Sequence, residues 1–145
     1  TWGNRVTRIC SWVRLLGKEG QSLYVYNTHW DHQSQPSREK AAELILKRVS
    51  ERKHSGDPVI LMGDFNATTT NPAIKTLIKS GALVDHGGEK QKQTFNFWKP
   101  GLNEGLRIDH IFTGPLIKKA KIEVPAASDP VDSDHNPVIL TFDGI

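Results

Sequence analysis

The run from Pro58 to Met62 constrains the fold most, because it is short and almost wholly apolar (PVILM). A strand with one solvated face alternates apolar and polar residues, whereas a strand buried on both faces reads as a continuous apolar run. The run therefore predicts a central strand of a sheet. Gly63-Asp64-Phe65-Asn66 follows it directly, so we expect polar side chains at the end of that buried strand. The glycine allows close backbone approach, and alternation along the chain points Asp64 and Asn66 the same way.

The rest of the chain supplies helices and further strands around this strand. Apolar residues recur at helical spacing in 36–53 and 71–80, and each segment has a proline near its start, which predicts two helices. Runs rich in β-branched and aromatic residues predict the other strands at 5–16, 22–28, 94–98, 108–113, 121–124 and 138–142. This order predicts an α/β fold in which helices cover one face of a single mixed sheet. The other face would expose a large apolar patch, so the sequence predicts a missing partner layer.

Size and composition indicate one ordinary globular domain spanning residues 1–145. The chain is 37% hydrophobic, and it has no apolar run near the ~20 residues of a membrane helix. The single cysteine, Cys10, excludes an intrachain disulfide and a cysteine metal cluster. The chain starts at Thr1 without a signal-type segment and reads as a cut end. We therefore expect a soluble protein whose compartment, cytoplasmic or exported, is left open.

Three more short polar motifs adjoin predicted strands. They are Asn27-Thr28-His29, Arg107-Ile108-Asp109-His110 and Ser133-Asp134-His135. Read singly, each has a structural alternative, since Ser-Asp-His suits a turn and a lone histidine is often part of the core. Together with Asp64 they place histidines and carboxylates at strand ends, which indicates metal-assisted hydrolysis of a phosphate ester.

The residue types suggest individual roles. Asp64 can orient a water or bind a metal, and Asn66 can stabilise a developing oxyanion. Asp109 lies in an otherwise apolar strand, so it must be paired, and His135 is the partner that the sequence offers. Asp134 is then free to ligate a hard cation. These oxygen-rich ligands favour Mg²⁺ or Mn²⁺ over zinc.

The four motifs, in this order, closely resemble those of the endonuclease/exonuclease/phosphatase superfamily, and of an uncharacterised bacterial branch in particular. The resemblance implies a four-layer α/β/β/α sandwich, of which this sequence looks like the second half only. It also implies a water-activating role for Asp64, a place beside the scissile phosphate for Asn66, and a phosphate contact for His29. Asp109 and His135 resemble the family's carboxylate–histidine dyad, and Asp134 resembles a metal ligand.

Residues next to His29 are the candidate substrate-binding residues. They are Asn27, Trp30 and Asp31, although Asp31 also suits a surface loop. Trp30 stands where the family more often has a smaller aliphatic residue, so the rim of the pocket is expected to differ.

The predicted function is divalent-metal-dependent phosphohydrolysis by an activated water, with a phosphodiester preferred. Nucleic acid, a phospholipid headgroup and a sugar or inositol phosphate are the rival substrates. The net charge of only +3, with little interleaving of arginine and aromatic residues, argues mildly against a processive nuclease. The resemblance implies that the principal metal-binding glutamate lies upstream of Thr1. The alternative is therefore an incomplete fragment or binding module, which needs an N-terminal half or a second chain to cover its sheet and complete its site.

Overall fold

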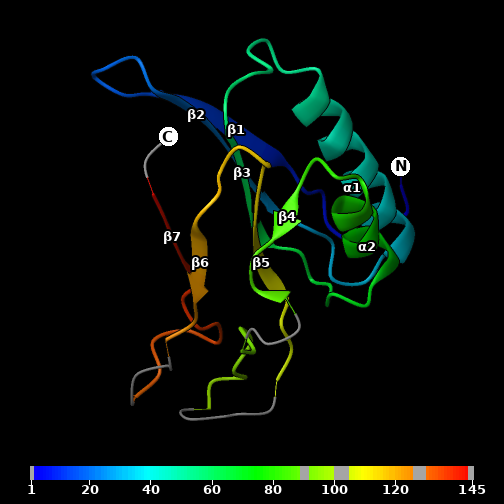
Figure 1. Ribbon diagram of the computed structural model, residues 1–145. Coiled ribbons are helices and arrows are strands. Elements are labelled where there is room, and N and C mark those ends of the chain that lie inside the picture. The colour runs from blue at the N-terminus through cyan, green and yellow to red at the C-terminus, as the bar shows by residue number, and fades with distance from the viewer. Residues whose placement is uncertain (1, 89–91, 100–104, 126–129, 144–145) are drawn as a thin grey trace.

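The computed structural model describes residues 2–88, 92–99, 105–125 and 130–143. In this part of the chain a five-stranded mixed sheet has two helices on one face and a separate two-stranded sheet beside the other (Figure 1). The predicted α/β class, with helices on one face of a mixed sheet, is confirmed.

The large sheet has the strand order β1-β2-β3-β5-β4. Its strands are β1 (Cys10–Leu16), β2 (Ser22–His29), β3 (Val59–Asp64), β4 (Val84–Asp85) and β5 (Asp109–Thr113). β2 and β3 run parallel, and the other pairs are antiparallel. β3 lies in the middle with Val59, Ile60 and Leu61 all buried, as the apolar run predicted. The sequence did not predict the two-residue strand β4.

The helices are α1 (Gln35–Ser50) and α2 (Pro72–Lys79). Ser34 and Asn71 cap their N-termini by accepting backbone N–H groups of the first turn, and a proline occupies the first turn of each helix. Their apolar faces pack on the sheet, where Ile45, Ile74 and Leu77 are at most 4% exposed. Neither helix has the length and apolar character needed to cross a membrane.

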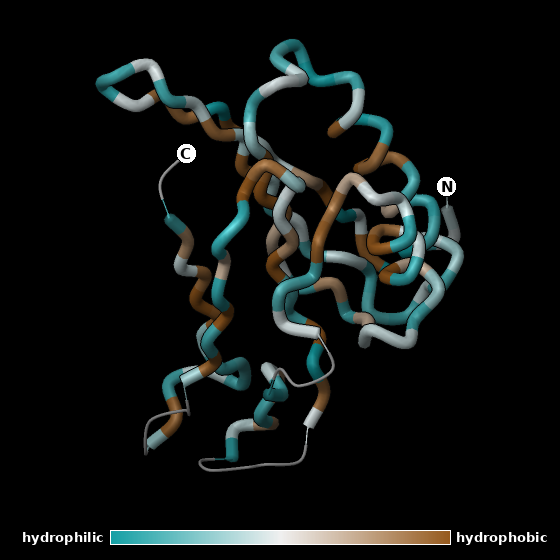
Figure 2. The backbone as a smooth tube through the Cα atoms, in the orientation of Figure 1, coloured by the Kyte–Doolittle hydropathy of each residue, from teal (hydrophilic) through white to brown (hydrophobic). Residues whose placement is uncertain are grey.

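The sheet face opposite the helices is partly covered by β6 (Ala120–Glu123) and β7 (Ile139–Phe142). These strands pair with each other rather than with the large sheet, so the prediction of one sheet is wrong for them. Their apolar side chains pack with those of the large sheet in a second core, which Figure 2 shows as hydrophobic stretches on both sheets. On β1, Val13 and Leu15 remain 52% exposed, so the covering is incomplete.

Two predicted strands are shorter than expected or absent. Residues 5–9 precede β1 instead of belonging to it. Segment 94–98 is not a strand, because only Phe95 forms isolated bridges, to Leu106 and to His135. Phe97 and Trp98 have left-handed backbones, with φ of 56° and 62°, and this conformation ends an extended segment.

Candidate active site

Three predicted site residues lie side by side at one edge of the large sheet. His29 ends β2, Asp64 ends β3 and Asp109 begins β5. The strand register pairs His29 with Asp64 and Asp64 with Asp109, so the three side chains form one row across three strands. His29 Nε2 lies 3.3 Å from Asp64 Oδ2.

This row faces away from the helices. Along β3, Val59 packs in the helix-side core, whereas Ile60 belongs to the core on the opposite face. Because side chains alternate along a strand, Asp64 shares the face of Ile60. The same alternation sends His110 to the helix side, where its ring centroid lies 5.5 Å from that of Phe65. His110 is therefore not part of the row.

Asn66 meets Asp64 through a turn. Its backbone φ is 46°, in the left-handed region that asparagine tolerates better than most residues. Its backbone N–H donates to Asp64 Oδ1 at 2.8 Å, and its Nδ2 lies 3.4 Å from Asp64 Oδ2. Nδ2 also donates to the Trp30 carbonyl at 3.1 Å. The two side chains lie close together, but this turn brings them there and the predicted strand alternation does not, because β3 ends at Asp64.

Gly63 lets β2 and β3 approach each other directly beside the row. Its φ is +143°, and a Cβ at this position would lie 1.8 Å from the Thr28 carbonyl oxygen. No side chain fits at that distance, so the glycine before Asp64 is required by packing. The predicted close backbone approach is confirmed.

We expect Gly63→Ala to destabilise the chain by roughly 3 kcal/mol or more, because the new methyl group forces β2 and β3 apart and strains the backbone. Urea unfolding followed by circular dichroism measures this loss. Gly81→Ala is the matched control, since Gly81 has φ +69° but nothing within 4 Å of its added Cβ. Equal losses in the two variants would show that backbone strain alone, and not the contact with Thr28, explains the glycine.

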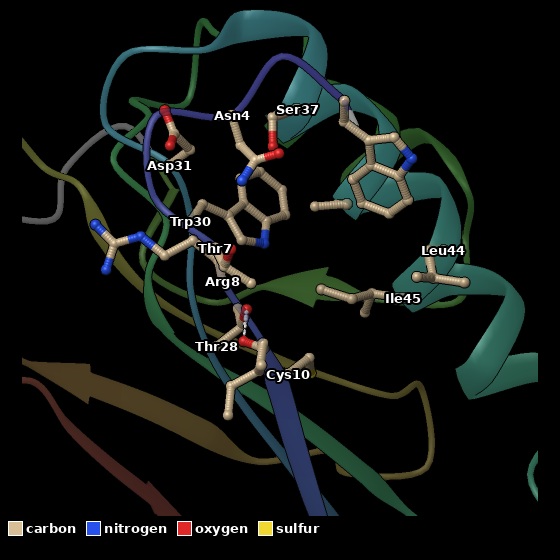
Figure 3. A pocket seen from close by; sticks show the side chains of 13 residues that line it. Asn4, Thr7, Arg8, Cys10, Thr28, Trp30, Asp31, Ser37, Leu44 and Ile45 are labelled. Carbon is tan, nitrogen blue, oxygen red and sulfur yellow. Dashed lines mark hydrogen bonds between the residues drawn. The ribbon is translucent and has the colours of Figure 1, made fainter.

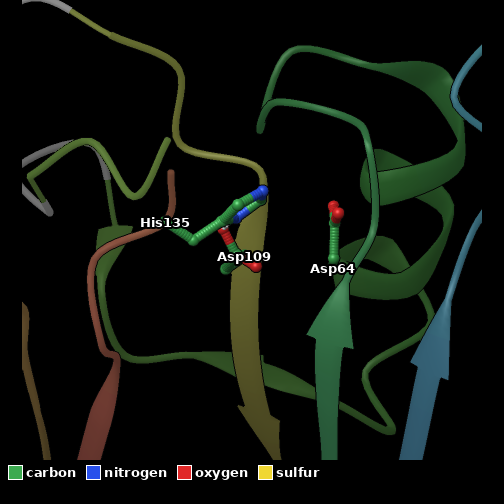
Figure 4. Close-up of side chains that lie close together, drawn as sticks. All are labelled: Asp64, Asp109 and His135. Carbon is green, nitrogen blue, oxygen red and sulfur yellow. Dashed lines mark hydrogen bonds and ion pairs between the residues drawn. The ribbon is translucent and has the colours of Figure 1, made fainter. Parts of the chain in front are cut away.

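His135 reaches the row from the loop that precedes β7. Its Nδ1 donates to Asp109 Oδ2 at 2.7 Å, and both side chains are mostly buried (Figure 4). The predicted pairing of Asp109 with His135 is confirmed. An ionised carboxylate only accepts hydrogen bonds, so the contact places a proton on Nδ1. Nε2 is then the ring nitrogen that can exchange a proton with a substrate.

Two carboxylates in close proximity define the electrostatics of the site. Burial raises the pKa of the Asp64 carboxyl above its ordinary value, and the charge of Asp109 acts in the same direction. The Asn66 backbone N–H and the two histidines oppose this shift. A carboxylate with a raised pKa is a stronger base towards a water molecule.

The same cluster offers ligands for a metal ion. Among the described residues, one donor atom each from Asp64, Asp109 and His135 lies within 4.8 Å of the others. Asp134 was also predicted as a metal ligand, but it is not part of this group. Its backbone carbonyl instead accepts a hydrogen bond from the Asn96 N–H at 2.7 Å. Ligation by the Asp134 carboxylate stays a prediction.

A cavity of about 210 Å³ adjoins the row on its open side. Its wall includes Asn27, Asp64, Asp109 and Asn136. Asn27 lines this cavity, and its contact with a substrate stays a prediction. Asn136 is a further residue at this wall that the sequence did not single out.

Trp30 lies away from this cavity. Its side chain is 1% exposed, and its ring packs edge-on against Phe65 with centroids 4.7 Å apart. It lines a separate cavity of about 190 Å³ between residues 2–10 and α1, on the helix side of the sheet (Figure 3). The prediction that Trp30 forms part of the substrate pocket's rim conflicts with this position, because the sheet separates the ring from the row.

Asp31 organises the loop after β2. Its carboxylate accepts backbone N–H groups from four residues, which are Arg5, Val6, Gln33 and Ser34, at 2.7–2.9 Å. These bonds, that of Val6 first, hold the pKa of Asp31 well below its usual range. The residue is also 1% exposed. The structure therefore gives Asp31 a structural role in place of the predicted contact with substrate.

Sequence reasoning missed two buried polar residues behind the dyad. Thr94 is 0% exposed and Asn96 is 1% exposed, and both hydrogen-bond to the segments that carry Asp109 and His135. Their segment was predicted as a strand because it is rich in β-branched and aromatic residues, and no further signal in the sequence indicated that these two polar side chains are buried.

The sequence and the fold of the chain are similar to those of known proteins. Residues 2–135 match the Endonuclease/Exonuclease/phosphatase family, and the chain belongs to this family. It is similar to the structure of a mannosyl-6-phosphatase of Bacteroides thetaiotaomicron, with 28% identity and a TM-score of 0.84 over 99% of this chain and 60% of that one. An endonuclease/exonuclease/phosphatase from Bacteroides vulgatus is 26% identical, with a TM-score of 0.83 over 98% of this chain and 58% of that one.

More distant structures share the fold alone. TDP2 of D. rerio, solved with a single-strand DNA product, is 17% identical, with a TM-score of 0.72 over 98% of this chain and 64% of that one. No curated protein sequence matches the chain. The chain spans less than two thirds of the length of these solved structures, so it covers only part of the family fold.

Proposed function

We propose that this chain carries the catalytic row of a divalent-metal-dependent phosphohydrolase, and that the complete protein cleaves a phosphodiester by attack of an activated water. The observation that carries the proposal is the row His29–Asp64–Asp109, with His135 hydrogen-bonded to Asp109 at 2.7 Å. This row combines a base, a phosphate-binding histidine and an oriented dyad at one edge of the sheet.

Each residue has a defined task in this proposal. Asp64 orients the attacking water and accepts its proton. His29 donates a hydrogen bond to a phosphoryl oxygen, on which negative charge builds up as the water attacks, and Asn66 lies beside this phosphate. Asp109 holds the His135 ring so that Nε2 faces the substrate. Asn27 contacts the substrate along the adjoining cavity.

A divalent cation fits the donor set of the cluster. Asp64 and Asp109 are mostly buried carboxylates on neighbouring strands, and a nearby cation would offset both the burial and the charge of Asp109 that raise the pKa of Asp64. Mg²⁺ or Mn²⁺ suits these oxygen ligands, with Asp64 and Asp134 as the proposed holders. Once bound, such a cation neutralises charge on the phosphoryl group and lowers the barrier to attack.

A sugar phosphate is the second candidate substrate. The mannosyl-6-phosphatase that the chain resembles at 28% identity is named for action on a phosphorylated sugar. The same row serves a monoester, because a monoester presents the same phosphoryl oxygens to His29 and Asn66. Nucleic acid is a weaker candidate, since the chain carries little excess positive charge.

Part of the fold and site is proposed to come from another segment or chain. The chain spans 60% of the length of the mannosyl-6-phosphatase structure, and Val13 and Leu15 remain exposed on the side opposite the helices. We therefore include, as the alternative, a fragment that is inactive until an N-terminal half or a second chain covers this face.

The test is turnover of a chromogenic phosphodiester and of a sugar 6-phosphate, with Mg²⁺ or Mn²⁺ and then with EDTA. The assay uses this chain alone and this chain combined with a segment or chain that supplies the rest of the family fold. Metal-dependent turnover in either form supports the proposal, and the faster substrate sets the class. Absence of metal-dependent turnover in both forms, with both folded, would refute a hydrolytic function.

A further inference from the structure

We infer that Thr94 and Asn96 are positioning residues that hold His135 against Asp109. This inference rests on the proposed function for its catalytic meaning and names residues that set the geometry of the same site. Both side chains are polar and almost fully buried, at 0% and 1% exposure. They lie between the strand that begins with Asp109 and the loop that carries His135.

Thr94 connects the two halves of the dyad directly. Its hydroxyl oxygen accepts the backbone N–H of Ile108 at 3.1 Å and that of Asp109 at 3.0 Å. Its carbonyl accepts the backbone N–H of Asn136 at 2.6 Å. Thr94 thus fixes both the start of β5 and Asn136, the residue directly after His135.

Asn96 holds the histidine loop from the same segment. Its backbone N–H donates to the Asp134 carbonyl at 2.7 Å. Its Nδ2 donates to the Ser133 carbonyl at 3.0 Å and to Asn136 Oδ1 at 2.9 Å, while its Oδ1 accepts the Trp98 N–H at 2.8 Å. Donors and acceptor of the amide are all used, so its orientation is fixed.

This arrangement matters because His135 lies in an irregular loop. Residues 130–137 contain no helix and no strand, so a sheet ladder does not fix the position of the ring. Asp109 is 26 residues away along the chain. Phe95, between the two positioning residues, adds a ring contact to His135 at 5.0 Å between centroids. The segment 94–96 therefore links two elements whose relative position sets the 2.7 Å contact.

The left-handed backbone that follows supports the same role. Trp98, with φ 62°, turns its N–H back to the Asn96 side chain. Strained residues persist where the surrounding structure over-determines them. Here the strain falls directly after the two buried polar residues and completes the hydrogen bonds of the Asn96 amide.

The primary experiment observes the dyad without any substrate. In nuclear magnetic resonance spectra of this chain, the His135 Nδ1–H donated to Asp109 is expected as a downfield resonance protected from exchange. Thr94→Val and Asn96→Leu remove hydrogen bonds with little change in side-chain size. We expect each to abolish this resonance or to accelerate its exchange by about tenfold or more. Thr94→Ser keeps the hydroxyl and is expected to retain the signal.

Matched controls separate positioning from general stability. Thr113→Val removes another fully buried threonine hydroxyl on β5, where it contacts His86 Nε2 at 2.6 Å. Asn71→Leu removes another hydrogen-bonded amide, at the start of α2. Both are expected to lower the urea midpoint while the His135 resonance persists.

Two outcomes would overturn the inference. One is an unchanged resonance in folded Thr94→Val or Asn96→Leu. The other is equal loss of the resonance in the controls at equal loss of stability. If Asn96→Leu does not fold, the isosteric pair Thr94→Val and Thr113→Val decides whether Thr94 positions the dyad or only stabilises the fold.

Activity measurements give an independent second readout. In an active form of the protein, the Thr94 and Asn96 variants are expected to lower kcat by about 10- to 100-fold while KM stays within about twofold, because a small misplacement of His135 affects the chemical step. A rise in KM with kcat unchanged would contradict a role of Thr94 and Asn96 in positioning His135. If no form of the protein turns over, the proposed function fails, whereas the resonance experiment still decides whether Thr94 and Asn96 hold the dyad.

Discussion

Asp64→Asn is expected to lower kcat of the active form by about 10³-fold or more, since the amide keeps the shape of the carboxylate but cannot accept a proton from water. Such a loss corresponds to about 4 kcal/mol of activation free energy. Steady-state kinetics with the better of the two substrates measures it. Asp143→Asn is the control, because Asp143 is 71% exposed and pairs with Lys119 just outside the two-stranded sheet. A loss below tenfold for Asp64→Asn would refute Asp64 as the base.

The same substitution is expected to stabilise the fold at neutral pH. The folded state raises the pKa of Asp64, so it favours the protonated carboxyl and is destabilised once the group ionises. Below the unfolded value of about 3.9, both proteins carry a neutral side chain and the difference vanishes. As pH rises through the unfolded and then the folded pKa, Asp64→Asn gains relative stability, seen as a melting temperature higher by roughly 2–4 °C. A variant less stable than the parent at pH 7 would contradict a pKa of Asp64 that burial and the charge of Asp109 raise.

A lower kcat together with a higher melting temperature in Asp64→Asn would show that the Asp64 carboxylate destabilises the fold but is needed for the reaction. Core substitutions lower stability and leave the reacting groups intact, and surface substitutions change little. Only a residue whose charge is costly in the fold and needed in the reaction gains stability and loses turnover together. Asn66 is a useful comparison, because its side chain spans Asp64 and the Trp30 carbonyl. Removal of the Asn66 side chain is expected to lower both the stability of the fold and kcat.

The sequence was informative wherever a local pattern had one physical reading. The apolar run before Gly63 predicted the central strand, and a carboxylate in the apolar β5 segment predicted a partner for Asp109. Gly63 itself followed from the need for close backbone approach. In each case burial leaves few alternatives, since a buried strand excludes polar residues and a buried charge needs a partner.

The sequence could not predict features that depend on strand register or on hydrogen-bond partners far away along the chain. The row from His29 to Asp109 requires the particular alignment of three strands, and a shift by one residue would send Asp64 to the helix side. Asp31 resembled an exposed loop residue, but backbone N–H groups from 25 and 26 residues upstream converge on it. Residues 94–98 alternate like a strand, yet Asn96 satisfies its amide on a loop about 40 residues later.

Removal of the dyad is the second large effect that we expect. His135→Ala should lower kcat by about 10³-fold, because the ring that we propose to contact the substrate is lost. Asp109→Asn should lower kcat by about 10²- to 10⁴-fold, since an amide that donates to Nδ1 moves the ring proton to Nε2 and so changes the tautomer that faces the substrate. The double variant should be no slower than His135→Ala alone, because Asp109 acts only through the ring. His54→Ala, an exposed histidine in the loop before β3, should leave kcat unchanged.

The double variant decides between two roles for Asp109. If the double variant loses as much kcat as Asp109→Asn and His135→Ala combined, then Asp109 acts on the substrate or a metal independently of the histidine. Its place in the 4.8 Å cluster also allows this role. If the losses are not additive, the 2.7 Å bond is the route of its effect. Since Thr94 binds the backbone of Asp109 and not its carboxylate, Thr94→Val should lower kcat in the parent and have no effect once His135 is removed. That pattern would show that Thr94 and Asp109 both affect catalysis through the position of the His135 ring beside the phosphate.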